Sequence, residues 1–243
     1  MTDGMTMAQA IRLATEVAMA ENPEVWIAGE GITRVFGTTD GLLERFGPDM
    51  VVEFPTSEAA CAGIVTGAAM CGGKPILVFQ RSEFSLLAAE QIINSAASLQ
   101  WWAGDAVKNA PVFRIIVGRG WGQGPQHSNN HRRSWEQIPS CKVMEPYNAE
   151  TAYYALGHLL KSQCLGFLIE NRWLFDRVDG GPMKERATAA LALPTQYVIE
   201  ASGSEVVEAE IAAERLAQEQ IGVVVVPHVT HYNTTDFPVG SVR

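Results

Sequence analysis

Short apolar segments alternate with helix-patterned segments along most of this chain, and this alternation restricts its fold more than any other feature. The predicted buried strands are residues 25–28, 75–79, 112–117, 142–144 and 166–170. The predicted helices are residues 7–20, 58–70, 85–102 and 149–161. Strands that are apolar at successive positions have both faces covered, which is typical of parallel sheets. We therefore predict an α/β fold with a mainly parallel sheet and helices on both faces.

The composition changes after residue 178, where Gly180-Gly181-Pro182 begins a linker-like stretch. We predict a first domain over residues 1–178, a linker over 179–194 and a second unit over 195–243. A unit of about fifty residues is too short for an independent doubly wound domain, so we expect it to lean on the first domain or on a partner. Its predicted elements are a strand at 197–200, a helix from a Ser202/Glu205 capping box to about residue 220, and a strand at 221–226.

The charge balance of the chain argues against polyanionic partners. Lys and Arg total 18 against 27 Asp and Glu, which gives a formal net charge of −9 at pH 7. We therefore expect binding neither to nucleic acid nor to an anionic membrane surface. The 4 cysteines form no CxxC pair, so we expect reduced thiols, no metal bound by this chain and a cytoplasmic location. No export signal or apolar run of about 18 residues predicts secretion or membrane insertion.

Ligands of open parallel sheets bind beyond the carboxyl ends of the strands, so the loops after the predicted strands are candidate sites. Glu30 follows the first strand, Glu58 begins a predicted helix, and His127 lies near the end of a glycine-rich run over residues 118–128. Each also has a simpler structural explanation. Glu30 is then a loop or capping carboxylate, Glu58 a helix cap, and His127 a hydrogen-bonded loop residue.

Glu58 is the most informative candidate because the helix behind it, residues 59–70, has almost no polar side chain. We expect so small and apolar a helix to pack closely on every side. A carboxylate on its first turn either caps the helix or is a buried acid that holds or passes a proton beside a ligand. The glycine-rich run lets backbone approach a ligand closely, although it matches neither a Walker sequence nor a dinucleotide fingerprint.

A series of motifs in fixed order carries a family resemblance. The motifs are Gly29-Glu30, residues 41–47 (GLLERFG), 55–59 (PTSEA), Ala62-Gly63, residues 67–70 (GAAM), 91–97 (QIINSAA), 126–128 (QHS), Ile138-Pro139 and residues 168–170 (LIE). From about Met7 to Phe175 the chain resembles the β subunit of the thiamine-diphosphate-dependent first component of 2-oxo acid dehydrogenase complexes, within the transketolase-like pyrimidine-binding superfamily. The resemblance implies that fold, followed by a shortened C-terminal unit.

The resemblance also implies roles for individual residues. Glu58 falls on the glutamate that bonds the aminopyrimidine ring of thiamine diphosphate and promotes its amino/imino shift, which agrees with an acid placed for proton transfer. Phe84 falls on the aromatic that packs against this ring, although without the resemblance core packing is the simpler explanation of a Phe there. His127 falls on the histidine that faces the substrate, and Glu30 lies in a loop near the cofactor.

A partner is implied as well. In the family, the diphosphate and Mg²⁺ are held by a Gly-Asp-Gly motif and a later Asn of the α subunit. Residues 104–109 (GDAVKN) lack the second glycine, and their Asn comes too soon. The resemblance therefore implies a separate α subunit that carries the diphosphate and Mg²⁺ site, in an α2β2 heterotetramer.

One segment departs from the dehydrogenase pattern. Residues 129–137 (NNHRRSWEQ) are polar, and Gln137 stands where relatives usually have a histidine. Arg132 and Arg133 either form a solvated turn or, with the adjacent His131, receive an anionic group of the substrate.

The predicted function is that of a β subunit in a heteromeric enzyme that decarboxylates a 2-oxo acid and transfers the acyl group. Two alternatives remain at this point. One is ketol or acyloin transfer of the transketolase type, in a biosynthetic pathway. The other is a structural partner subunit without catalytic activity, against which the presence of both Glu58 and His127 argues.

Overall fold

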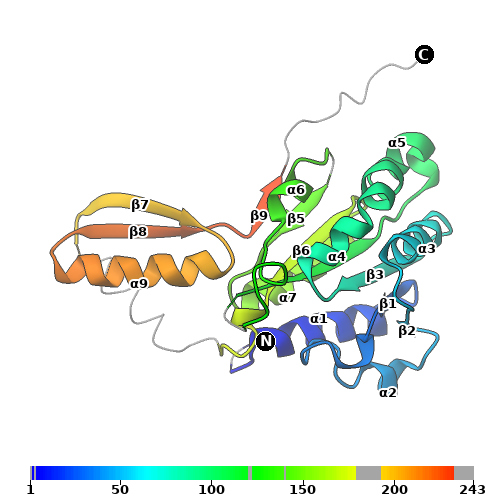
Figure 1. Cartoon of the computed structure of the whole chain (residues 1–243), viewed down its shortest axis with the longest axis horizontal. Coiled ribbons are helices and arrows are strands. Elements are labelled where there is room, and N and C mark those ends of the chain that lie inside the picture. Colours follow the sequence, from blue (N-terminus) through cyan, green and yellow to red (C-terminus); the bar gives the residue numbers. More distant parts are fainter. Residues whose placement is uncertain (1, 3, 120–121, 140, 179–192, 233–243) are drawn as a thin grey trace, which may run out of the picture.

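Seven strands form the main sheet, in the order β2-β1-β3-β4-β6-β5-β9 (Figure 1). The computed structural model describes residues 2, 4–119, 122–139, 141–178 and 193–232. β9 runs antiparallel to β5, and every other neighbouring pair is parallel. The strands are β1 (Val25–Gly29), β2 (Val51–Glu53), β3 (Lys74–Phe79), β4 (Val112–Val117), β5 (Lys142–Met144), β6 (Gly166–Asn171) and β9 (Thr230–Tyr232). The predicted α/β fold with a mainly parallel sheet is confirmed.

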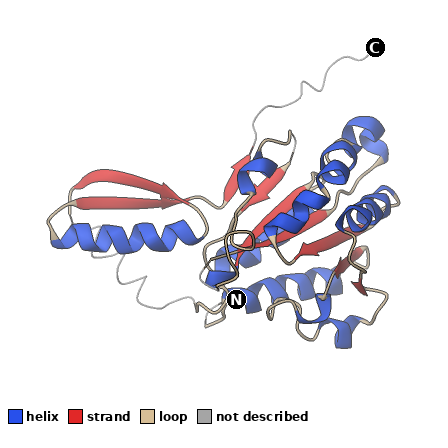
Figure 2. Cartoon of the chain, viewed as in Figure 1, coloured by secondary structure: helices blue, strands red, loops and turns tan. Residues whose placement is uncertain are grey.

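Helices cover both faces of this sheet (Figure 2). The helices α1 (Met7–Glu21) and α7 (Ala149–Lys161) pack against each other on one face. The other face carries α3 (Glu58–Met70), the π-helix η2 (Gln91–Ala96) and α6 (Arg132–Glu136). Each face of the sheet thus has its own hydrophobic core. Ile76 and Val78 of β3 belong to the core under α1 and α7, and Leu77 and Phe79 belong to the core under α3, because side chains alternate along a strand. The shorter elements are α2 (Leu42–Phe46), α4 (Ser82–Leu87), α5 (Leu99–Ala103) and the 3₁₀ turns η1 (Ile32–Arg34), η3 (Gly104–Ala106) and η4 (Arg172–Leu174).

The single helix predicted over residues 85–102 is wrong. The structure divides this segment among α4, η2 and α5. Within the π-helix, the amide of Ala97 donates to the carbonyl of Ile92, five residues earlier, at 2.9 Å. This wider turn keeps both Ile92 and Ala96 buried against α3, which packs on η2.

The second unit consists of β7 (Thr195–Ala201), α9 (Ser204–Gln218) and β8 (Gly222–Pro227), with the two strands parallel. After β8 the chain reaches β9, which adds to the main sheet (Figure 1). The last described residues therefore lean on the first domain, as expected from their number. Residues 179–192 of the predicted linker lie outside the described residues.

The capping box predicted at Ser202 and Glu205 is wrong. The helix α9 begins at Ser204, and its N-cap is Gly203, with φ of 53°. The hydroxyl of Ser202 instead donates to the carboxylate of Glu145, at 3.3 Å. A Cβ at Gly203 would lie 2.5 Å from the Glu145 Oε1 atom, so only glycine fits this close approach. Contact between the two units thus replaces the local cap.

The helix α3 is packed on one side only, in contrast to the prediction that it is buried all round. Cys61, Ala62 and Val65 are buried, whereas Ile64 is 54% exposed and Met70 is 53% exposed. The buried side chains of the helix belong to the core on its own face of the sheet. The described part of the chain contains no helix that is long and apolar enough to span a membrane. All cysteines are free.

Candidate active site

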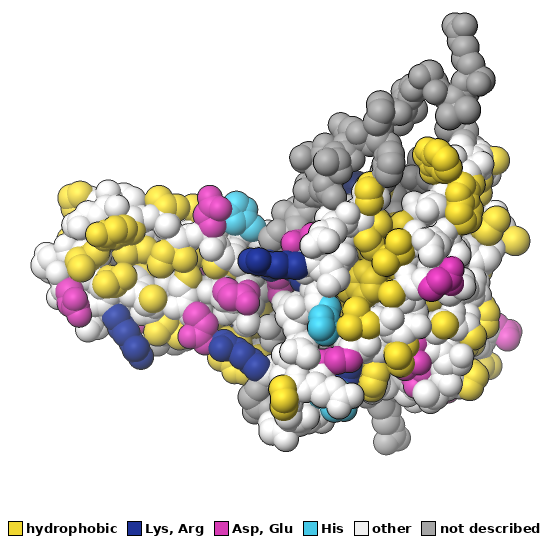
Figure 3. All heavy atoms as spheres, turned by 45° about the horizontal axis from the view of Figure 1, so that its top comes forward, with side chains coloured by type: hydrophobic (Ala, Val, Ile, Leu, Met, Phe, Trp, Pro, Cys, Tyr) yellow, Lys and Arg dark blue, Asp and Glu magenta, His cyan; other side chains and the backbone are white. Residues whose placement is uncertain are grey.

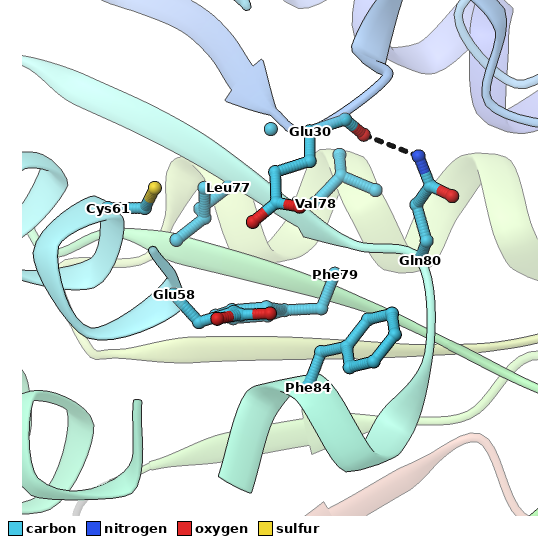
Figure 4. Close-up of a pocket in the computed structure, with 9 residues that line it drawn as sticks. Glu30, Glu58, Cys61, Leu77, Val78, Phe79, Gln80 and Phe84 are labelled. Carbon is cyan, nitrogen blue, oxygen red and sulfur yellow. Dashed lines mark hydrogen bonds between the residues drawn. The ribbon is translucent and has the colours of Figure 1, made fainter. Parts of the chain in front are cut away.

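Parallel strands end at the same edge of a sheet, and the loops that follow β1, β2 and β3 form a pocket at that edge (Figure 4). The pocket is a hollow of about 420 Å³, with open solvent at its mouth included. Its lining residues are Gly29, Glu30, Glu58, Cys61, Leu77, Val78, Phe79, Gln80 and Phe84. The structure thus brings together Glu30, Glu58 and Phe84, which the sequence singled out separately.

Glu58 is the first residue of α3, and its carboxylate projects into the pocket toward Phe79 and Phe84 (Figure 4). It is partly exposed in this chain rather than fully buried. The N-cap residue of α3, Ser57, makes no side-chain capping bond. Within the described residues, no group donates a hydrogen bond to the Glu58 carboxylate. This carboxylate is therefore available to a ligand instead of serving as a cap of its own helix.

Glu30 is positioned by hydrogen bonds from two neighbouring loops. The hydroxyl of Thr56 donates to its carboxylate at 3.0 Å, and the side-chain amide of Gln80 donates to its carbonyl oxygen (Figure 4). The loop that carries Glu30 is fixed further by Glu53 at the end of β2, whose carboxylate accepts from the amides of Gly31 and Ile32. Glu30 therefore belongs to a wall of the pocket that hydrogen bonds from neighbouring loops hold in place.

His127 does not line the pocket itself but contacts the residue that closes one side of it. The rings of His127 and Phe84 meet edge to face, with centroids 5.7 Å apart. The segment after His127 is held over α4, because the amide of Asn129 donates to Glu83 at 3.3 Å and that of His131 to Ser82 at 3.1 Å. The Nδ1 atom of His127 is buried and has no hydrogen-bond partner in the described structure. Such an unsatisfied atom is expected where a ligand supplies the missing partner.

Sequence reasoning missed five residues that complete the pocket, which are Cys61, Leu77, Val78, Phe79 and Gln80. The sequence offered little indication of these residues, because each is of a type common in a hydrophobic core or at the end of a strand. Burial raises the pKa of the Cys61 thiol, and the negative charges of Glu30 and Glu58 raise it further, so this thiol stays protonated and unreactive. Leu77 and Phe79 provide an apolar floor beside two carboxylates.

Arg132, Arg133 and His131 are not among the pocket-lining residues. The guanidinium of Arg132 pairs with Glu136 and with the fully buried Glu145. Two carboxylates of its own chain therefore balance the charge of Arg132, which joins α6 to the end of β5. Arg133 is exposed.

The sheet order of this chain places a carboxylate on the first turn of an apolar helix, beside an aromatic ring, at the carboxyl edge of a parallel sheet. Residues 3–174 match the family model described as transketolase, pyrimidine binding domain. The chain belongs to this family, which confirms the resemblance seen in the sequence.

Relatives of the chain carry the names of β subunits. The chain is 33% identical over 236 residues to the mitochondrial pyruvate dehydrogenase E1 component subunit beta-1 of Arabidopsis thaliana, covering 91% of this chain and 64% of that protein. It is 37% identical over 149 residues to the pyruvate dehydrogenase E1 component subunit beta of Rickettsia conorii, covering 60% and 46%. The chain thus spans about half to just under two thirds of these relatives.

Solved structures show the same fold. A split-gene transketolase, described as an inactive beta4 tetramer, superposes with a TM-score of 0.70 at 18% identity, over 93% of this chain and 72% of that chain. The transketolase of Leishmania mexicana superposes with a TM-score of 0.74 at 20% identity, over 95% and 35%.

Proposed function

We propose that this chain is the pyrimidine-binding β subunit of a heteromeric, thiamine-diphosphate-dependent enzyme that decarboxylates a 2-oxo acid and transfers the acyl group. The observation that carries the proposal is the Glu58 carboxylate, which lies without a hydrogen-bond donor from the described residues in an apolar pocket beside Phe84. The names of the relatives, which are β subunits of pyruvate dehydrogenase, support the same class of reaction.

The residues of the pocket fit the aminopyrimidine of thiamine diphosphate. Leu77, Phe79 and Phe84 offer apolar surface to a flat ring, and Glu58 offers a carboxylate to a ring nitrogen. The unsatisfied Nδ1 atom of His127 fits a polar group of the substrate or cofactor beyond Phe84. When bound, thiamine diphosphate supplies a nucleophilic carbon that stabilises the negative charge left by decarboxylation. In this proposal Glu58 holds and moves the proton at the ring nitrogen, and Phe84 orients the ring.

The proposal includes an α subunit that holds the diphosphate and Mg²⁺, in an α2β2 heterotetramer. It is supported by a broad apolar surface beside the pocket, which Figure 3 shows as gathered hydrophobic side chains. The exposed large side chains of this surface, on α3, α4, η2 and α5, are Ile64, Met70, Leu86, Leu87, Ile93, Trp101 and Trp102. An exposed apolar surface of this kind is typical of a protein interface.

The proposal keeps the predicted location and drops the predicted substrate contacts of the arginines. A cytoplasmic location is retained as a prediction, although some relatives are named as mitochondrial proteins. Substrate contacts by Arg132, Arg133 and His131 are not part of the proposal, because these residues do not line the pocket and Arg132 is paired with Glu136 and Glu145.

Co-expression with its α subunit tests the proposal directly. The purified complex is expected to reduce ferricyanide with simple 2-oxo acids only when thiamine diphosphate and Mg²⁺ are both added. If the complex instead transfers a ketol group between sugars and releases no CO₂, the transketolase-type alternative is correct. A complex that binds thiamine diphosphate but performs neither reaction would support the alternative of a structural subunit.

A further inference from the structure

One buried carboxylate lies where three segments of the chain meet. Glu145 directly follows β5 and is fully buried. Its Oε1 atom accepts a hydrogen bond from the side-chain amide of Asn130, at 3.0 Å. Its Oε2 atom accepts from the guanidinium of Arg132 and, at 3.3 Å, from the hydroxyl of Ser202. Asn130 and Arg132 lie in the segment after His127, here residues 128–132. Ser202 belongs to the second unit, so one carboxylate connects both parts to the end of β5.

The carboxylate of Glu145 depends on these partners because it has no access to water. Burial raises the pKa of Glu145, and the charge of Arg132 opposes this effect. Arg132 also forms an ion pair with Glu136, with 2.7 Å between Nε and Oε1. A buried charge that loses a donor is left uncompensated, since no water replaces the lost hydrogen bond. Glu145 therefore holds its donors more firmly than an exposed carboxylate would.

The segment after His127 is bonded to two different parts of the fold. The amides of Asn129 and His131 donate to side chains of α4, at 3.3 and 3.1 Å. The side chains of the residues that follow each of them donate to the buried carboxylate instead. His127, at the start of the segment, meets Phe84 edge to face. The position of the His127 ring thus depends on contacts to α4 and on contacts to the end of β5.

The second unit completes the same arrangement. The hydroxyl of Ser202 donates to Glu145 and also accepts from the guanidinium of Arg132. The next residue, Gly203, lies so close that a Cβ there would be 2.5 Å from the Glu145 Oε1 atom. The carboxylate is therefore enclosed by the segment after His127 on one side and by the start of the second unit on the other.

We propose that Glu145 is a positioning residue for the reaction, which holds the segment after His127 in place and thereby keeps the His127 ring beside Phe84. This inference rests on the proposed function for the role of His127, whereas the claim about the segment itself does not depend on it. Glu145 is not among the residues that line the pocket. A shift of about 1 Å in an active-site group can lower the rate by about 100-fold, so such a residue affects kcat without touching the substrate.

Hydrogen exchange of the purified full chain, followed by NMR, tests the positioning role. The amide of His131 reports on the segment, because it donates to the Ser82 hydroxyl at 3.1 Å. Glu145→Gln keeps the shape of the side chain but removes its charge, and exchange of this amide is expected to become about tenfold faster or more. Asn130→Ala removes one donor from an exposed residue and is expected to act in the same direction. It keeps the test available if Glu145→Gln fails to fold.

Two control variants separate positioning from general stability. Asn129→Ala removes the same kind of side chain one position earlier, which does not bond to Glu145, and His131 should exchange at the wild-type rate. Ser204→Ala removes a hydrogen bond of 2.8 Å from the side-chain amide of Asn171. This bond also joins the second unit to the main sheet but does not involve the segment after His127. Exchange of His131 in Ser204→Ala is therefore expected at the wild-type rate as well.

Kinetics of the assembled enzyme give a readout that a merely structural role would not move. With kcat taken per bound thiamine diphosphate, Glu145→Gln is expected to lower kcat by about 10- to 100-fold while Kd of the cofactor stays near the wild-type value. A loss of folded protein alone would leave this kcat unchanged. Arg132→Lys keeps a cation beside Glu145, so it should retain more of kcat than Arg132→Gln does.

The inference is overturned if His131 exchanges at the wild-type rate in Glu145→Gln and Asn130→Ala, or if Ser204→Ala accelerates its exchange equally. Faster exchange in Glu145→Gln with unchanged kcat per bound cofactor would also overturn it. Glu58→Gln separates this inference from the proposed function, because it should lose activity and keep the wild-type exchange rate. A wild-type complex without activity would contradict the proposed function, and the exchange measurement would still decide whether Glu145 holds the segment.

Discussion

At the scale of single residues, Glu58 shows how the fold leaves one carboxylate available to a ligand in the pocket. It begins α3 at the point where the loop after β2 meets the ends of β1 and β3, so its side chain projects over the sheet edge. The rest of α3 is apolar or small, and no described group donates a hydrogen bond to the carboxylate. The sequence alone could single out this acid as a candidate, because it stands before an almost wholly apolar helix, but it left a helix cap as an equal alternative.

Replacement of Glu58 by Gln is expected to lower turnover of the assembled enzyme by about 10²- to 10⁴-fold, the contribution of a positioned acid–base group. Gln keeps the size of the side chain but has no ionisable proton, so assembly should be unchanged. Glu44→Gln, on the exposed side of α2, is the matched control and should keep full turnover. Turnover near the wild-type value in Glu58→Gln would remove this residue from the reaction.

The buried Lys74 leads to a prediction about how the free energy of unfolding depends on pH. It is 1% exposed, and burial lowers the pKa of its ammonium group to about 8. The Nζ atom donates to the carbonyls of Ala110 at 2.9 Å and Ser162 at 2.6 Å. Between the folded pKa and the ordinary value near 10.5, the unfolded chain binds a proton that the folded chain does not. Stability is therefore expected to rise with pH in this window.

Relative to Lys74→Met, the wild-type chain should gain about 2 kcal/mol of unfolding free energy between pH 8 and pH 10. Denaturant unfolding of both proteins across this range measures the gain, and Lys108→Met corrects for an exposed lysine. A constant difference between wild type and Lys74→Met would show that Lys74 is not neutralised in the folded chain.

At the scale of secondary-structure elements, an ion pair ties β4 to β6 inside the core. Arg114 and Glu170 are both fully buried, and the guanidinium meets the carboxylate through two hydrogen bonds, one of them 3.0 Å from Nη2 to Oε2. Arg114 Nη1 has no partner in the described structure. Charges in an apolar core carry a large desolvation cost, so their attraction contributes little net stability while each single charge depends on the other.

Arg114→Met or Glu170→Met alone is therefore expected to lower the free energy of unfolding by about 3 to 5 kcal/mol. The double variant should recover most of this loss, because it leaves no unpaired buried charge. A double-mutant cycle from denaturant unfolding separates the two terms. Additive losses in the double variant would contradict this account of the pair.

The elements that sequence patterns failed to predict are those set by contacts between distant residues. The apolar strands and the helices α1, α3 and α7 were evident from periodicity. The break at η2 was not, because a π-turn depends on how Ile92 and Ala96 pack against α3. Ser202 had the spacing of a cap but bonds to Glu145 in the other unit. The contact between Phe36 and Arg172 gave no signal either, since the segments after β1 and β6 become neighbours only in the folded chain.

At the scale of the whole molecule, the pocket lies beside an apolar surface that the chain leaves exposed. Trp101 is 71% exposed and Trp102 is 61% exposed, both on α5, and Leu87 at the end of α4 is 64% exposed. Large aromatic side chains are frequent among the residues that dominate interface energies. Glu58 and Phe84 open toward solvent at the mouth of the pocket, so a partner seated on this surface would also enclose the cofactor. Catalysis and assembly are thus expected to share one side of the molecule.

Replacement of Trp101 and Trp102 together by Ser should therefore weaken binding to the α subunit. Loss of one interface hot spot costs about 2 kcal/mol or more, so Kd is expected to rise by about 30-fold or more. Both side chains are exposed in the isolated chain, and its thermal unfolding should be nearly unchanged. Tyr154→Ser is the matched control, because Tyr154 is 63% exposed on α7, which covers the opposite face of the sheet. Analytical ultracentrifugation of α and β mixtures measures Kd for each variant, and equal Kd values for the Trp variant and the wild-type chain would place the interface elsewhere.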